Sequence, residues 1–567
     1  MKNSKYFILA VLVLGIGLFI ERYNFVYAES IQPGQEVSVV PSVWNETIAH
    51  SINEKKITLI IDEKQIELTK DKVYMDDSLN LMIPISVLKG NFDSGVHFYN
   101  NTTLLIERNE VSITLNKDDY FMMVNQEPRT LSATLVQDNE TIYIPVDALV
   151  EGLKCSYLWD IETNTATINN LATDTKKIPY LYDYRQTIRS PLVKDQGPYG
   201  TCWAFASLTA LESSLLPEEV FNFSQDHMSI HNSFSSELND GGEYTMSIAY
   251  LASWQGPVLE KDDPYGDGES PEDLKAVKHV QEVQIIEGKD FDKIKEMVYK
   301  YGGVQSSLYT SLKDSESRSI YYNRETYAYC YIGTEKPNHD VVIIGWDDNY
   351  SKDNFNMDLE ANGAFICRNS WGEEFGDSGT FYVSYYDANI GIHNVVYTGI
   401  EESDNYDNIY QSDLCGWVGQ LGYGKDYAYF ANVYKAKSNE KLKAVSFYAT
   451  GKDTEYEIYL VRDFEDSSSL NKRGFIKSGK FNNAGYYTVD LNTDIELNQG
   501  EKFAIVVKIR TPNSERPIVI EYVADASTKD VILTDGEGYI SLQGKRWESA
   551  EKTQNSNLCL KVFTDVD

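Results

Sequence analysis

Short runs of alternating apolar and polar residues predict β-strands over much of the first third of the chain. One run occurs twice: residues 83–88 read Ile-Pro-Ile-Ser-Val-Leu and residues 144–149 read Ile-Pro-Val-Asp-Ala-Leu. Phe98 and Trp159 follow the two copies at the same offset. In each copy a strand is expected to end at proline, and a Ser or Asp is expected to cap a short helix. The repeat predicts a small α+β domain over residues 55–170.

A helical pattern follows a polar connector of Thr, Asp and Lys residues. Leu208, Leu211 and Leu215 fall on one face of the predicted helix, and Pro217 closes it. Apolar strand-like runs come later in the same region. We expect this central domain to span residues 180–400.

Strand-like runs without intervening helices fill the last part of the chain, beyond the acidic stretch 401–408. Examples are residues 443–448, 456–461 and 503–507, and Gly, Asn and Asp turns separate such runs. Consecutive strands of this kind favour an antiparallel β-sandwich, here expected over residues 405–567.

The length of 567 residues exceeds what one hydrophobic core supports, in agreement with several domains. At the N-terminus, Lys2 and Lys5 precede an apolar run from 6 to 20, and the small-residue site 26–28 follows. This order predicts a signal peptide over residues 1–28 and therefore export. The alternative is an N-terminal anchor that is retained.

Charge and cysteine usage narrow the classes of function. Lys and Arg total 51 against 86 Asp and Glu, a formal net charge of −35, which opposes binding to nucleic acids and to anionic membranes. The six cysteines are scattered singly, without the paired spacing of a zinc site or of a small disulfide scaffold. We therefore expect neither a metal nor an organic cofactor.

The segment around Cys202 carries the strongest chemical signal. It reads Asp-Gln-Gly-Pro-Tyr-Gly-Thr-Cys-Trp-Ala-Phe from residue 195, and the predicted helix begins at its cysteine. Thr201 is expected to cap this helix, whose unpaired N–H groups favour a thiolate. Gln196 is placed to join the Cys202 backbone N–H in holding an oxyanion.

A base and its orienting partner are expected from two later strands. His339 begins the apolar run Val-Val-Ile-Ile, 137 residues after Cys202, and Asn369 ends another strand in the sequence Arg-Asn-Ser-Trp-Gly. Asn369 can accept a hydrogen bond from the imidazole and fix its tautomer. Trp371 can shield that hydrogen bond from water.

With these motifs in order, residues 180–386 resemble the papain family of cysteine peptidases. The resemblance places Cys202, His339 and Asn369 in the catalytic triad and makes Gln196 the oxyanion glutamine. It implies a two-lobed core with a helical lobe and a β-barrel lobe, so the fold class is multidomain α+β. The expected substrate-binding residues are Gly241, Gly242, Asp340 and Trp371.

By the same resemblance, Asp340 matches a position near the pocket for the second residue of the substrate. It either favours basic side chains there or has only a structural role.

The sequence departs from this family in three places. Tyr199 and Asn239 occupy positions where relatives commonly carry a disulfide pair, so packing must hold this loop. Residues 347–363 form a polar insertion that we expect to be a surface loop. No long helical prosegment precedes the central domain, which leaves the mechanism of latency open.

The flanking domains have resemblances of their own. The first resembles the N-terminal domain of copper amine oxidases, although His97 is its only histidine and copper is not implied. The last resembles a lectin-like domain, which implies either glycan binding or a purely supporting role.

These observations predict a secreted or cell-surface cysteine peptidase that hydrolyses proteins or peptides through a Cys202 thioester. The partners would be protein substrates and, through the C-terminal domain, cell-wall or host glycans. The alternative is a surface adhesion or carbohydrate-binding protein whose peptidase domain is an inactive scaffold. Acyl transfer would use the same triad and is not distinguished by the sequence.

Overall fold

The computed structural model describes residues 49–566 apart from 63, 69–70, 93, 100–101, 109–110, 126, 139–140, 162, 171–177, 187–189 and 315. The predicted signal peptide and most of the polar connector fall outside the described residues. The chain forms two compact units, one of residues Met1–Val96 and Asn100–Lys177, the other of His97–Tyr99 and Ile178–Asp567.

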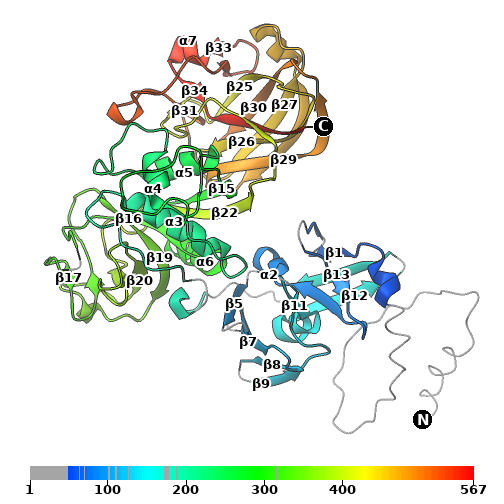
Figure 1. Cartoon of the computed structure of the whole chain (residues 1–567), viewed down its shortest axis with the longest axis vertical. Coiled ribbons are helices and arrows are strands. Elements are labelled where there is room, and N and C mark those ends of the chain that lie inside the picture. Colours follow the sequence, from blue (N-terminus) through cyan, green and yellow to red (C-terminus); the bar gives the residue numbers. More distant parts are fainter. Residues whose placement is uncertain are drawn as a thin grey trace, which may run out of the picture. The chain divides into compact units, whose positions relative to one another are not determined.

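Two copies of a strand–helix unit form the centre of the first unit (blue to cyan in Figure 1). Strand β4 (Leu81–Pro84) leads into helix α2 (Ser86–Asn91), and β11 (Thr141–Pro145) leads into a π-helical turn, η1 (Ala148–Gly152). The two strands pair antiparallel, with Ile83 opposite Ile144. Both strands end at proline, as the repeat predicts.

The predicted helix caps of this unit are wrong. Neither helix has a side-chain cap, because tertiary partners compete for the capping groups. The Ser86 hydroxyl donates to Asp71 (2.8 Å), and the Asp147 carboxylate accepts the Ser132 N–H (2.5 Å). The other strands of the first sheets are β1 (Thr58–Ile61), β2 (Lys64–Ile66), β3 (Tyr74–Met75), β10 (Val136–Asp138), β12 (Cys155–Asp160) and β13 (Thr165–Asn170); a further sheet has β5 (Gly95–Tyr99), β6 (Thr103–Arg108), β7 (Val111–Asn116), β8 (Phe121–Val124) and β9 (Glu127–Thr130).

The second unit begins with a helical lobe packed on a β-rich lobe. Helix α3 (Cys202–Leu215) is buried along most of its length, and it ends two residues before Pro217. Its leucines share one apolar core with strand β19 (His339–Asp347). The remaining elements of this region are β14 (Leu181–Asp183), η2 (Tyr184–Gln186), α4 (Gln225–Ile230), α5 (Tyr244–Ala252), β15 (Lys278–Ile286), α6 (Phe291–Tyr301), β16 (Val304–Leu308), β17 (Tyr322–Asn323), β18 (Ala328–Tyr329), η3 (Lys352–Asn354), β20 (Ala364–Arg368), β21 (Thr380–Ser384) and β22 (Asn394–Glu402).

The polar insertion after β19 is only partly a surface loop. It contains the short helix η3, and Phe355 and Leu359 are buried against Ala328, Cys330 and Ala364. The insertion therefore adds a small core to the edge of the β-rich lobe.

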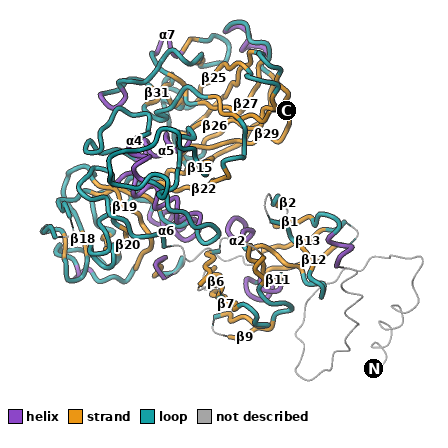
Figure 2. Tube along the Cα trace, viewed as in Figure 1, coloured by secondary structure: helices purple, strands orange, loops and turns teal. Residues whose placement is uncertain are grey.

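A single sheet runs from the β-rich lobe into the C-terminal domain. Its central order is β19-β16-β22-β15-β29-β26-β35, and β15 pairs with both β22 and β29 (Ala484–Leu497). Figure 2 shows these strands following one another between the two domains. The acidic stretch 401–408 holds the end of β22 and the start of β23 (Asn408–Tyr410). A continuous backbone ladder therefore joins the two domains.

The C-terminal domain is an antiparallel β-sandwich. Its second sheet has the order β28-β27-β30-β25-β32-β33, and a buried apolar core that includes Phe447, Ile458 and Val507 lies between the two sheets. The three strand-like runs of the sequence fall in β26 (Glu440–Ala449), β27 (Thr454–Val461) and β30 (Lys502–Arg510), which confirms them. The other elements are β24 (Gly419–Leu421), β25 (Tyr427–Lys435), η4 (Ser467–Lys472), β28 (Gly474–Phe481), β31 (Ile518–Glu521), η5 (Ala526–Thr528), β32 (Gly538–Ser541), β33 (Glu548–Ser549), α7 (Ala550–Gln554), β34 (Asn557–Leu558) and β35 (Leu560–Val566).

Within the part of the chain that the structure describes, no helix combines the length and the apolar character needed to cross a membrane.

Candidate active site

Cys202 is the first residue of helix α3. The Thr201 carbonyl accepts the backbone N–H groups of Ala204 and Phe205, which starts the helix immediately after it. The predicted Thr201 side-chain cap is wrong, because this hydroxyl pairs with the Tyr265 hydroxyl at 2.7 Å. The half-buried sulfur of Cys202 accepts a backbone hydrogen bond from Asp340, the residue after His339. The packing of α3 on β19 therefore brings the thiol to the end of the strand that carries the histidine.

His339 and Asn369 meet because β19 and β20 are antiparallel neighbours, with Val342 opposite Arg368. Strand β20 ends at Arg368. Because the two strands run antiparallel, the residues that follow Arg368 lie next to the start of β19, where His339 is. The ring Nε2 lies 2.7 Å from the Asn369 Oδ1, and both residues are buried. The Trp371 ring lies over the imidazole, with 4.9 Å between the ring centroids. The indole therefore packs against the imidazole that forms the hydrogen bond with Asn369.

Gln196 is fixed beside this pair by the chain around Ser370. Its backbone N–H donates to the Ser370 carbonyl (2.8 Å), and its Oε1 accepts the Ser370 hydroxyl (2.6 Å). Its Nε2 donates one hydrogen to the Tyr199 carbonyl at 2.7 Å. A side-chain amide has two such hydrogens, so the second can serve an oxyanion.

The electrostatics of the site differ from those that the helix position predicts. Burial and, to a smaller extent, the Asp340 carboxylate together raise the pKa of the Cys202 thiol to about 12, while backbone hydrogen bonds from Asp340 and from the start of α3 lower it only in part. Burial also lowers the pKa of His339 to about 4, against the effect of the Asn369 hydrogen bond. Since charged groups are costly in a water-poor site, the neutral thiol and imidazole are favoured here.

Asp340 belongs to a buried polar network. Its two carboxylate oxygens accept from the Ser307 hydroxyl (2.6 Å) and the Gln305 amide (3.0 Å), and both donors lie on β16. Burial raises the pKa of Asp340 to about 6, and the nearby Glu243 carboxylate adds to the shift. Asp340 is therefore held by side chains and is 8% exposed.

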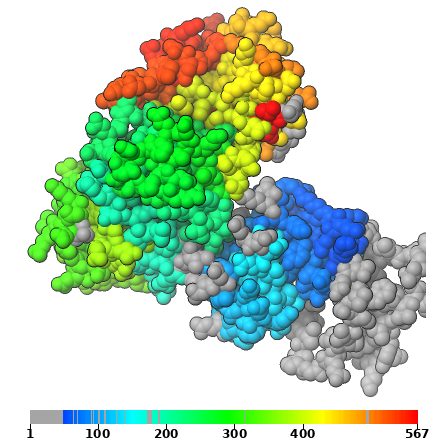
Figure 3. Space-filling view, in the orientation of Figure 1, coloured from blue at the N-terminus to red at the C-terminus, as the bar shows by residue number. Residues whose placement is uncertain are grey.

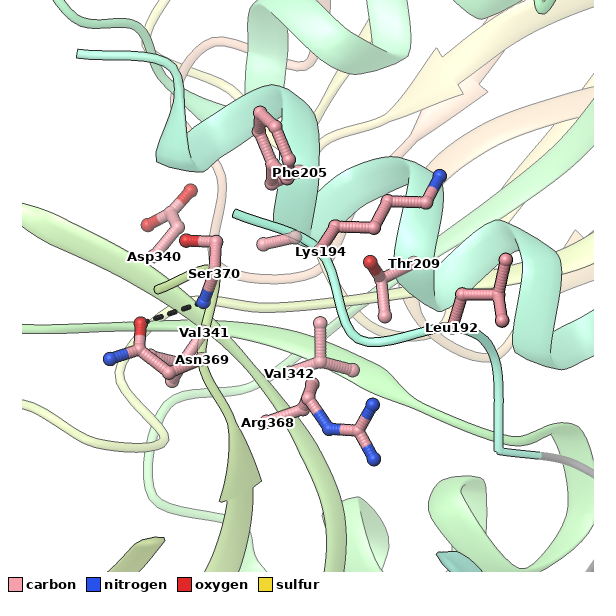
Figure 4. A pocket seen from close by; sticks show the side chains of 11 residues that line it. Leu192, Lys194, Phe205, Thr209, Asp340, Val341, Val342, Arg368, Asn369 and Ser370 are labelled. Atoms are coloured by element: carbon pink, nitrogen blue, oxygen red, sulfur yellow. Dashed lines mark hydrogen bonds between the residues drawn. The ribbon is translucent and has the colours of Figure 1, made fainter. Parts of the chain in front are cut away.

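A cavity of about 10 Å³ lies behind these residues, between α3 and the strands β19 and β20. Figure 4 shows Asp340, Asn369 and Ser370 toward one end of it and Lys194 and Thr209 toward the other. This volume holds about one water molecule. This cavity is therefore too small to hold a peptide.

The glycine pair lies next to the loop that carries the cysteine. Gly241 has a φ of +78°, a conformation that glycine adopts readily. A Cβ at Gly242 would come within 2.5 Å of the Trp203 indole, which follows Cys202 in helix α3. The backbone at Gly242 therefore leaves no room for a side chain. It packs directly against the residue that follows Cys202.

All six cysteines are free in the structure. At the place where relatives carry a disulfide, the Gly200 N–H donates to the Leu238 carbonyl at 2.9 Å, between the positions of Tyr199 and Asn239. Across the described ranges, no group of three or more His, Cys, Asp and Glu side chains is arranged to hold a metal ion.

Sequence reasoning missed three residues of the site. Gln305 and Ser307 hold Asp340, and Ser370 holds Gln196. Of these three, only Ser370 could have been suspected from the sequence, because it directly follows Asn369 in the Arg-Asn-Ser-Trp-Gly motif. Gln305 and Ser307 lie on the short interior strand β16, whose sequence contains no motif that indicates a role at the site.

Comparisons with known proteins agree with the three domains. The chain matches the pattern of the papain family cysteine protease over residues 178–400, of the copper amine oxidase N-terminal domain over 60–168, and of the lectin-like domain over 409–564.

Two curated relatives resemble the protease region. A viral cathepsin of Heliothis zea nuclear polyhedrosis virus is 27% identical over 36% of this chain and 52% of its own length. Pro-cathepsin H of Mus musculus is 26% identical over 46% of this chain and 74% of its own. The chain thus spans about half of the first relative and three quarters of the second.

Two solved structures cover both the protease and the C-terminal domains. The clostridial cysteine protease Cwp84 after propeptide cleavage is 27% identical, with a TM-score of 0.61 over 68% of this chain and 99% of that one. The protease and lectin-like domains of Cwp84, a surface layer associated protein of Clostridium difficile, are 26% identical, with a TM-score of 0.59 over 69% and 90%. Residues 178–400 therefore form a domain of the papain family of cysteine proteases, with a copper amine oxidase N-terminal type of domain before it and a lectin-like domain after it.

Proposed function

We propose that the protein hydrolyses peptide bonds through a thioester on Cys202. The observation that carries this proposal is the buried His339–Asn369 pair, whose histidine directly precedes Asp340, the residue whose backbone N–H bonds the Cys202 sulfur at the start of α3. His339 takes the thiol proton as the sulfur attacks the substrate carbonyl carbon, and it gives that proton to the leaving amine when the C–N bond breaks. Water, activated by His339, then hydrolyses the thioester and regenerates the thiol.

Two N–H groups would hold the oxyanion during both steps. They are the second amide hydrogen of Gln196 and the backbone N–H of Cys202. Gln196 is prepared for this role because Ser370 and the Tyr199 carbonyl already fix its orientation.

Replacement of Cys202 by alanine tests the proposal. The C202A variant should lose both hydrolysis of a fluorogenic peptide and labelling by a thiol-directed epoxide, while its unfolding midpoint stays unchanged. Full activity of C202A would remove Cys202 from the reaction. If C202A loses labelling but the unmodified protein hydrolyses no peptide either, the inactive scaffold is favoured instead.

The products identify hydrolysis rather than acyl transfer. With a peptide substrate and an added amine, hydrolysis yields a free carboxylate, whereas acyl transfer yields a new amide. Mass spectrometry of the products distinguishes the two.

We also propose that Asp340 favours a basic side chain at the second substrate residue before the scissile bond. Its carboxylate is close to the sulfur and has Glu243 nearby, so negative charge gathers on this side of the site. A substrate backbone extended along Gly241 and Gly242 would bring that side chain toward Asp340. Cleavage of a peptide library should show Arg or Lys preferred over Leu there, and equal rates would remove the idea.

The lectin-like domain offers a surface for a glycan partner. A groove of about 590 Å³ on the outer face of β27, β28 and β30 combines the Phe475 ring, 60% exposed, with Glu457 and Arg510. An exposed ring can stack on a sugar, and charged groups can bind its hydroxyls. Glycan-array binding by the full-length C202A variant, lost in a C202A/F475A variant, would support this partner, and absence of binding leaves the domain a supporting role.

We place the protein outside the cell, either secreted or on the cell surface. The predicted signal peptide and the likeness to a surface layer associated protein support this location. Fractionation of the producing cells into cytoplasm, wall and medium tests it.

A further inference from the structure

A loop of the lectin-like domain reaches the segment that precedes the glycine pair. Ser235 lies in the segment 231–240 between α4 and α5. Its backbone N–H donates to the Ser527 carbonyl at 2.7 Å, and its hydroxyl donates to the Asp530 carboxylate at 2.6 Å. In Figure 3 the orange-red part of the C-terminal domain lies against the green part of the peptidase domain, where these residues belong.

The lectin-like side of this contact is well ordered by its own hydrogen bonds. Ser527 belongs to η5, where the Asp525 carboxylate accepts the Ser527 N–H (2.8 Å) and the Thr528 hydroxyl accepts the Asp525 N–H (3.1 Å). This reciprocal capping fixes the direction of the Ser527 carbonyl. The lectin-like domain is joined to the peptidase domain through the β15–β29 ladder. The loop that carries Ser527 and Asp530 is therefore held in place relative to the peptidase domain.

The peptidase side leads from Ser235 directly to the site. The Asp240 carboxylate accepts the Glu237 N–H (2.9 Å), and the Leu238 carbonyl accepts the Gly200 N–H, two residues before the nucleophile. Gly200 also packs closely on Gly241, since a Cβ at Gly200 would lie 3.0 Å from the Gly241 nitrogen. Movement of the segment 231–240 would therefore displace both the glycine pair and the loop before Cys202.

We propose that Ser527 and Asp530 of the lectin-like domain position the substrate-binding segment of the peptidase domain by holding Ser235. In this protein positions 199 and 239 carry no disulfide. The hydrogen bonds of Ser235 to Ser527 and Asp530 restrain the same segment instead. Ser235 and Asp530 are thus positioning residues that touch no substrate. This inference rests on the proposed peptidase function, because it assigns the glycine pair to substrate binding.

The test compares the full-length S235A/D530A variant with a D426N control. Asp426 also forms a hydrogen-bonded pair, at 3.0 Å with Arg510, but this pair lies within the lectin-like domain. For a peptide substrate, S235A/D530A should raise KM about threefold or more and leave kcat within about twofold, because two hydrogen bonds are lost. The D426N control should keep both constants unchanged.

A second readout does not depend on activity. Hydrogen exchange followed by mass spectrometry should show faster exchange of residues 232–242 in S235A/D530A, with the rest of the peptidase domain unchanged. Adding Y199C and N239C to that variant should restore KM once the new disulfide forms, because the Gly200–Leu238 hydrogen bond brings these two positions together.

The outcomes separate the inference from the proposed function. Unchanged KM, or unchanged exchange of residues 232–242, would overturn the positioning role even when the C202A variant behaves as expected. If the unmodified protein hydrolyses no peptide, the proposed function fails, and the exchange measurement alone then decides whether the lectin-like loop holds this segment.

Discussion

Replacement of Gly242 by alanine should damage the site through a clash whose size the structure gives. A Cβ at this position would lie 2.5 Å from both Cε2 and Nε1 of Trp203 and 2.7 Å from its Cδ2. Cβ contacts under 3.0 Å essentially never occur and ordinary contacts begin near 3.4 Å, so movement of the indole or of the glycine segment must supply about 0.5 to 0.9 Å. Trp203 is only 3% exposed and follows Cys202 directly, so its ring has little room to move.

The cost follows from the cost of overpacking a well-packed core. Such insertions destabilise by about 1–3 kcal/mol. The same strain moves the backbone that is expected to pair with the substrate, so KM should rise. A loss of kcat/KM of roughly 5- to 150-fold corresponds to that range of free energy.

The assay measures urea unfolding and the hydrolysis of a fluorogenic peptide for the G242A variant. A G474A variant is the control, because a Cβ there would meet only the Leu460 carbonyl at 3.8 Å on an exposed strand. G474A should keep the stability and the kinetics of the unmodified protein. If G242A also keeps both, the close contact between Gly242 and Trp203 is not what limits this position, and the reasoning is refuted.

Three further outcomes are expected. N369A removes the 2.7 Å partner of His339 and should lower kcat about 10- to 100-fold with little change in KM, whereas an equal rise in KM would contradict an orienting role. The pKa of Asp340 is about 6, above its ordinary value, so its carboxylate is mostly charged only above that pH. A preference for Arg over Leu in the substrate should therefore be present above pH 6 and fade below it. The D340N variant should show no such preference at any pH. With a Cys202 pKa raised to about 12, alkylation by iodoacetamide should keep increasing up to alkaline pH, and a plateau between pH 4 and 8 would show that a thiolate–imidazolium pair is already formed.

The positions of the proposed catalytic residues could be predicted because each lies at one end of a regular element within a recognisable local motif. Cys202 begins a helix, His339 begins an apolar strand, and Asn369 follows one, so the sequence contains both their chemistry and their local geometry. The leucine face of α3 and the strands β26, β27 and β30 were predictable for the same reason, since periodicity is a local property.

The features that could not be predicted depend on distant partners. The pairing of β15 with β29 joins residues about 200 positions apart, as between Gln284 and Gly485, and no local pattern indicates it. The expected caps at Thr201 and Ser86 are wrong because Tyr265 and Asp71 bind their hydroxyls. Propensity is a weak guide wherever such tertiary partners compete.

The charge state of the nucleophile shows the same division between local and distant effects. The start of α3 does lower the thiol pKa, as its position in the helix predicts, but burial and the Asp340 carboxylate outweigh that effect. Burial lowers the pKa of His339. It therefore disfavours both the thiolate of Cys202 and the imidazolium of His339. Both shifts favour the neutral thiol and imidazole in the free site, so in the proposed reaction proton transfer to His339 would accompany the attack on the substrate. The buried Asn369 hydrogen bond and the Gln196 amide then matter most, because they stabilise charges that exist only while the reaction proceeds.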